Sequence, residues 1–130
     1  LTGDVSEDAS APSYGRVAAL LDSLGSPVLA LPGNHDDAAV MRRYFPRGPW
    51  DTPLFHEARG WQLVLLDSAA PGRIDGVLSR SQLQALKTGL QRCRSEHILV
   101  GLDHLVKNDQ ATPTPDKDLL QLFFHLGKAN

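Results

Sequence analysis

Three short polar clusters in this chain carry side chains that can bind a metal ion or move a proton. They are Gly3-Asp4, Gly33-Asn34-His35-Asp36 and Asp103-His104. The second and third follow apolar runs that predict buried strands, and the first looks like the exit of such a strand. Binding sites in open α/β sheets lie at the carboxyl ends of the strands, so we expect these clusters to converge in space. The side chains expected there are Asp4, Asn34, His35, Asp36, Asp103 and His104.

Carboxylate, amide and imidazole donors suit Mn, Fe, Zn or Mg, and they do not suit copper or an iron–sulfur cluster. A glycine directly before Asp4 and before Asn34 lets the backbone turn sharply and approach a ligand closely. Each residue taken alone also has a simpler explanation. Asp36 could cap the helix that follows it, Asn34 could form an Asx-turn, and His104 could face solvent in a loop. The ordered string Gly-Asn-His-Asp favours a site, because a turn needs only the glycine or the asparagine.

The elements that must position these clusters alternate between strands and helices. Apolar runs predict buried strands at 27–31, 61–66 and 98–102. Helical spacing of apolar residues predicts helices at 14–24, at 36–44, from Ser79 onward and at 117–126. Ser79 and Gln82 form a capping-box pattern. Prolines and glycines predict loops at 45–53, 69–76 and 105–118. This alternation predicts an α/β architecture in a single domain over residues 1–130.

Composition narrows the function classes. A chain of 130 residues and 14.1 kDa has room for one domain. Its 13 Lys+Arg and 15 Asp+Glu give a net charge of −2, which argues against nucleic-acid binding by bulk charge. No run approaches the ~18 apolar residues of a membrane-spanning helix, so no membrane partner is expected. The single cysteine, Cys93, favours a reducing compartment, and a cytoplasmic location is therefore expected.

Five motifs together carry a family resemblance. They are Thr2-Gly3-Asp4, the block Leu31 to Asp37 (LPGNHDD), Leu65 to Ser68 (LLDS), Gly76 to Ser79 with Gln82-Leu83, and His97 to Leu102. On these motifs, about residues 1–104 of the chain resemble the calcineurin-like metallophosphoesterases. The branch is that of the bacterial cyclic-nucleotide phosphodiesterases, with glycerophosphodiesterases as near relatives. The resemblance implies an αββα sandwich with a binuclear site for Mn, Fe or Zn, which hydrolyses a cyclic nucleotide or another small phosphodiester.

The resemblance also implies roles for the matching residues. The aspartate matching Asp4 bridges both metals, and the asparagine matching Asn34 binds the second metal. The histidine matching His35 stabilises the transition state or protonates the leaving oxygen, and the aspartate matching Asp36 orients that histidine. In the family a metal-bridging hydroxide attacks phosphorus in line, while two cations neutralise the developing charge.

Two family motifs, Asp-x-His and Gly-His-x-His, are absent from this sequence, and they supply four of the usual metal ligands. We therefore expect a metallophosphoesterase domain truncated at both ends, without the first strand and the C-terminal strands. Where the branch has a run of histidines, this chain has Leu102-Asp103-His104-Leu105-Val106. The ligand position falls on Asp103, with His104 one residue on, and both are kept as candidate metal ligands. Three candidate ligands could hold one metal weakly.

We accordingly expect the 130-residue chain to be inactive or impaired as a phosphodiesterase, and it could bind no metal at all. The alternative function is a catalytically silent remnant that acts as a self-associating or binding module. Exposed sheet edges pair with other chains, and the segment 117–126 is apolar on more than one side. A homodimer through either feature is expected. Arg42, Arg43 and Arg47 could reach a phosphate, although a solvated face explains them better.

Overall fold

Three helices and three strands make up the part of the chain that the computed structural model describes, residues 1–70 and 72–104. In chain order they are α1 (Ala11–Asp22), α2 (Ala38–Tyr44), β1 (Leu54–Ala58), β2 (Trp61–Leu65), α3 (Arg80–Arg92) and β3 (His97–Gly101). The predicted α/β class is confirmed. The predicted loop 105–118 and helix 117–126 lie outside the described residues. Within the described ranges, no helix has the length and apolar character needed to cross a membrane.

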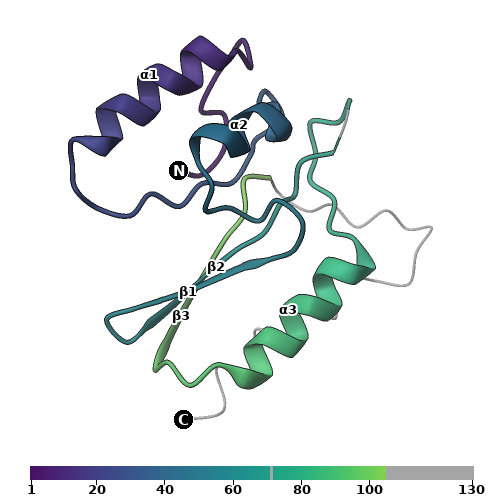
Figure 1. Cartoon of the computed structure of the whole chain (residues 1–130). Helices are drawn as coiled ribbons and strands as arrows, with labels where there is room; N and C mark the ends of the chain where they lie inside the picture. The colour runs from purple at the N-terminus through teal and green to yellow at the C-terminus, as the bar shows by residue number, and fades with distance from the viewer. Residues whose placement is uncertain (71, 105–130) are drawn as a thin grey trace.

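The strands form one sheet in the order β1-β2-β3 (Figure 1). β1 and β2 are antiparallel and are joined by Arg59 and Gly60, whose φ angles are 52° and 82°. Two successive positive φ values are typical of the tight turns that match the twist of a hairpin. β2 and β3 are parallel, and α3 supplies the crossover that such a pair requires. β1 was not predicted from the sequence, because Arg-Gly is a weak turn signal and apolar and polar residues do not alternate regularly in LFHEA.

Helix α3 covers one face of this sheet (Figure 1). Ser79 caps it, and Ser79 and Gln82 form the predicted capping box. The sheet core contains five buried residues: Val64, Leu66, Leu78, Leu86 and Leu90. Ile98 and Val100 of β3 pack against this core, whereas Leu99 is 55% exposed. The prediction of a fully buried third strand was therefore wrong, because α3 shields only alternate residues of β3.

Helices α1 and α2 enclose a second core of Tyr14, Ala30, Met41 and Phe45. Ser10 caps α1, which begins earlier than predicted because Pro12 is tolerated in a first helical turn. The segment 27–31 was expected to be a buried strand. Ala30 and Leu31 are fully buried, but the segment makes only one parallel bridge, between Thr2 and Leu31. The Leu31 N–H donates to the carbonyl of Leu1 within this bridge, whereas the Ala30 N–H donates to the carbonyl of Arg47, so no continuous ladder forms.

The sheet core makes a direct stability prediction. Leu86 is fully buried under α3, so Leu86→Ala should lower the free energy of unfolding by about 2–5 kcal/mol through lost burial and a residual cavity. Leu20 on α1 is 72% exposed, so Leu20→Ala should change the free energy of unfolding by less than about 0.5 kcal/mol. Urea unfolding followed by circular dichroism measures both. Equal effects of the two substitutions would contradict the described packing of α3.

Candidate functional site

The carboxylate of Asp36 joins the N-terminal segment to the turn that follows Leu31. Its Oδ2 accepts hydrogen bonds from the backbone N–H groups of Val5 (3.1 Å) and Gly33 (2.9 Å). Its Oδ1 accepts from the backbone N–H of Ser6 (3.1 Å) and from the hydroxyl of Tyr14 (2.9 Å). Four hydrogen bonds to one carboxylate hold the N-terminal segment and the turn after Leu31 at fixed positions relative to each other. Asp36 is therefore an anchor of the site's backbone.

Tyr14 extends this anchor into the core of α1 and α2. Its ring is fully buried, and its hydroxyl also accepts a hydrogen bond from the backbone N–H of Asp37 (3.0 Å). Burial raises the pKa of the Tyr14 hydroxyl to about 12, so it remains a donor to Asp36 across the physiological range. The carboxylate of Asp37 caps α2 through the N–H groups of Ala39 and Val40. The capping role considered for Asp36 therefore belongs to Asp37.

Asp4 lies directly against the turn that carries Asn34 and His35. Its Oδ1 accepts a hydrogen bond from the backbone N–H of His35 at 3.2 Å. A Cβ atom at Gly33 would overlap Asp4, and a Cβ at Gly3 would overlap the carboxylate of Asp103. Gly3 and Asp4 both have left-handed backbones, with φ of 83° and 46°. The left-handed backbone of Asp4 is strained for a residue with a side chain, and the close approach of Gly3 brings this segment against Asp103.

His104 connects the remaining candidates. Its Nε2 lies 3.3 Å from Oδ1 of Asn34 and 3.3 Å from Oδ2 of Asp103. Its Nδ1 lies 3.0 Å from the hydroxyl of Ser68. His104 is buried, so the alternative of a solvent-facing loop histidine is wrong. The structure thus brings Asn34, Asp103 and His104 together, with Asp4 beside them.

The electrostatics of this cluster favour a cation. Burial raises the pKa of Asp103; the nearby His104 opposes this effect, while the charges of Asp4 and Asp36 add to it. Burial also raises the pKa of Asp67, at the exit of β2, against the opposing effects of the Ala69 N–H and His104. The negative charges of Asp4 and Asp36 act on Asp103, and a bound cation would relieve their repulsion.

The separations between the candidate ligand atoms are compatible both with hydrogen bonds of the His104 ring and with a shared metal ion. Two ligands held at ~2.0–2.1 Å from a tetrahedral metal lie about 3.3–3.4 Å apart. The separations from Nε2 of His104 to the oxygens of Asn34 and Asp103 are both 3.3 Å. In the described part of the chain, no three His, Cys, Asp or Glu side chains are placed to hold a metal. A three-donor set around His104 therefore exists only if the amide oxygen of Asn34 is counted with Asp103. Asp103 and His104 are both available as ligands, and the set suits one ion.

His35 lies at the rim of this cluster, and its partner differs from the one expected. Nδ1 of His35 lies 3.4 Å from Oε2 of Glu7, and both side chains are exposed. The oxygens of Asp36 are directed to the backbone of residues 5, 6 and 33 and to Tyr14. Asp36 therefore does not contact the ring of His35 in this structure, and the ring is paired with Glu7 instead. Sequence reasoning missed Glu7, because a glutamate in a polar loop carries no signal by itself.

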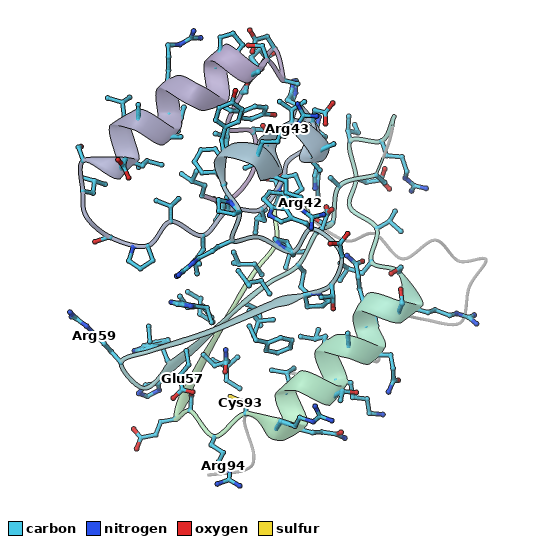
Figure 2. All side chains as sticks on the ribbon, in the orientation of Figure 1. Arg42, Arg43, Glu57, Arg59, Cys93 and Arg94 are labelled. Atoms are coloured by element: carbon cyan, nitrogen blue, oxygen red, sulfur yellow. The ribbon has the colours of Figure 1, made fainter. Side chains whose placement is uncertain are left out.

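The three arginines considered as phosphate ligands are exposed, Arg42 and Arg43 on α2 and Arg47 in the loop after it. Arg42 forms an ion pair with Asp51 at 3.0 Å, which supports the assignment to a solvated face. Figure 2 shows Arg42 and Arg43 at α2, while Arg59 and Cys93 lie at the opposite end of the sheet. The distal end of the sheet therefore takes no part in the cluster around His104.

Comparison with known proteins gives the family context. A family model of calcineurin-like phosphoesterases matches residues 1–129. A probable cyclic nucleotide phosphodiesterase of Synechococcus sp. is 37% identical over 100 residues, which cover 77% of this chain and 39% of the relative. The 3′,5′-cyclic adenosine monophosphate phosphodiesterases CpdA of Pseudomonas aeruginosa and Vibrio vulnificus are 35% and 40% identical, each over 79% of this chain and 38% of the relative. The chain thus matches about two-fifths of the length of these curated relatives.

The Tyr14–Asp36 hydrogen bond predicts a stability change with a defined pH dependence. Tyr14→Phe should lower the free energy of unfolding by about 1.5–3 kcal/mol, since a bond to a charged group is lost. The pKa of Tyr14 is raised from 10.0 to about 12 in the folded chain. Its contribution is therefore fully present below pH 10 and is lost as the pH rises toward 12. Urea unfolding from pH 7 upward measures both effects. Tyr44→Phe is the control, because it keeps the Tyr14–Asp36 hydrogen bond, so the loss of stability as the pH rises toward 12 should remain.

Proposed function

This chain belongs to the calcineurin-like phosphoesterase family, and we propose that its Asn34–Asp103–His104 cluster holds a divalent metal ion for phosphodiester hydrolysis. The observation that carries the proposal is the pair of 3.3 Å separations from Nε2 of His104 to the oxygens of Asn34 and Asp103. The curated relatives are named as cyclic nucleotide phosphodiesterases, which supports a cyclic nucleotide as the substrate class. Mn, Fe and Zn each suit this donor set.

The side chains of the cluster differ in their exposure to solvent. His104 is buried and Asp103 is half-buried, whereas Asn34 and Asp4 are exposed. A substrate therefore approaches from the side of Asn34 and Asp4. A bound divalent cation supplies Lewis-acid polarisation of a phosphoryl oxygen and a lowered pKa for a coordinated water. The contribution of the chain is to hold His104 on the buried side and to leave the opposite side open.

His35 is placed to handle the proton of the leaving group. Its backbone N–H bonds to Asp4, so the ring is carried at the edge of the cluster. The partly exposed imidazole lies 3.4 Å from the carboxylate of Glu7. A protonated imidazole at this position can donate to the oxygen that leaves phosphorus. Asp4 and Glu7 together thus orient His35, one through its backbone and one through its ring.

The described residues supply donors for one ion, while the family resemblance implies two. The catalytically silent binding module is therefore the competing function, and the absence of metal binding would favour it. The expected homodimer and cytoplasmic location stay predictions.

Removal of the Asn34 amide, whose oxygen is a proposed metal ligand, should abolish metal-dependent turnover. With Mn²⁺, the chain should hydrolyse bis(p-nitrophenyl) phosphate and a cyclic nucleotide only slowly, because the described residues supply donors for one ion where the family resemblance implies two. Asn34→Ala should reduce kcat/KM by more than about 100-fold, because loss of an outer-shell partner alone commonly costs 10–100-fold. Gln84→Ala removes an exposed amide of α3 and should leave turnover unchanged. A folded chain with no bound metal and no turnover would contradict the proposed function and favour the silent module.

The orienting role of Glu7 predicts a smaller effect. An exposed ion pair contributes about 0.2–1 kcal/mol, so Glu7→Gln should lower kcat by up to about fivefold and leave metal affinity unchanged. Glu57 of β1 lies at the far end of the sheet (Figure 2), which makes Glu57→Gln the matched control. Steady-state kinetics and Mn²⁺ titration measure both quantities. Identical kcat values for the two variants would exclude an orienting role for Glu7.

A further inference from the structure

Ser68 makes two contacts with His104 from the side opposite the candidate ligands. Its side chain is fully buried, at 0% exposure. Its Oγ lies 3.0 Å from Nδ1 of the His104 ring and accepts a hydrogen bond from the backbone N–H of His104 at 3.2 Å. One hydroxyl thus contacts both the backbone and the ring of this residue, which limits the rotation of the imidazole.

Ser68 is itself fixed by the start of α3. Its carbonyl accepts a hydrogen bond from the backbone N–H of Val77 at 3.0 Å. The carbonyl of the preceding Asp67 accepts one from the side-chain amide of Gln82 at 2.8 Å, and Gln82 belongs to the capping box of α3. A Cβ at Gly76 would lie 2.7 Å from Cβ of His104 and 3.1 Å from Cβ of Ser68, so the packing around the pair is tight. The hydroxyl therefore acts from a rigid support.

The groups around His104 decide whether each ring nitrogen donates or accepts a hydrogen bond. Nε2 of His104 faces two oxygens, on Asn34 and Asp103, and both are acceptors. When the ring hydrogen lies on Nε2, it faces these two acceptors, and the Ser68 hydroxyl donates to Nδ1. For Nε2 to ligate a cation, the ring hydrogen must lie on Nδ1 instead, and Nδ1 then donates to the oxygen of Ser68. A hydroxyl can serve both arrangements, because it carries one donor and two acceptor positions.

We propose that Ser68 is a positioning residue that holds the His104 imidazole in one orientation with and without metal, by reversing the direction of a single hydrogen bond. The part of this inference that concerns the metal-bound state rests on the proposed function. Neither the family match nor the names of the relatives assign a role to Ser68. An alanine at this position could support neither tautomer and would leave the ring free to turn away from Asn34 and Asp103.

Metal affinity provides the first test. In Mn²⁺ titration calorimetry of the chain, Ser68→Ala should raise the Kd about 10–100-fold, the usual effect of removing the outer partner of a ligand histidine. Ser10→Ala removes the capping hydroxyl of α1 and is the control for general destabilisation. It should lower the Tm and leave the Kd unchanged. Equal Kd values for wild type and Ser68→Ala would overturn the proposal.

The tautomer of His104 provides a second test that needs no metal and no activity. Nitrogen-15 NMR of the metal-free wild-type chain should show the neutral His104 ring with its hydrogen on Nε2. Ser68→Ala should give averaged ring-nitrogen shifts. A wild-type ring with its hydrogen on Nδ1, or an unchanged spectrum in Ser68→Ala, would overturn the inference. If wild type binds no Mn²⁺, the proposed function fails, while this spectrum still decides the role of Ser68.

Discussion

The convergence of four hydrogen-bond donors on the carboxylate of Asp36 is the constraint on which the site depends. Three of these donors are backbone N–H groups from two segments separated by about thirty residues, and the fourth is the hydroxyl of buried Tyr14. Buried amides need partners, and one carboxylate satisfies several of them at once. Asp4 and the Asn34–His35 turn are thereby held against each other, although no continuous strand ladder connects them.

The site lies where the two hydrophobic cores meet. The core of α1 and α2 positions Asn34 through Tyr14 and Asp36, and the core of the sheet and α3 positions His104 through Ser68. The 3.3 Å contact between His104 and Asn34 joins the two sides. A cation shared by these donors would also tie the two cores together, so metal binding and folding stability should be linked.

The positions of Asp103 and His104 could be predicted from sequence because they follow strand β3, whose carboxyl end lies at an edge of the sheet. Asn34 follows an apolar run that joins no sheet in the described part of the chain and meets the N-terminal segment only through the Thr2–Leu31 bridge. Helix α3 was predictable because its capping box and its leucine spacing agree. β1 was not, since its turn uses Arg59, which carries no strong turn signal. The partners Glu7 and Ser68 were also missed. Their roles depend on contacts with residues 28 and 36 positions further along the chain, which no local pattern reveals.

The central claim is that Asn34, Asp103 and His104 form one cation site, and the most direct test is anomalous diffraction from crystals of the chain soaked in Mn²⁺. The account predicts an anomalous peak within a coordination distance of about 2.0–2.2 Å from Nε2 of His104, with an oxygen of Asn34 or Asp103 as a second ligand. A map in which His104 keeps its contacts at 3.3 Å with no peak between the three side chains would contradict the account.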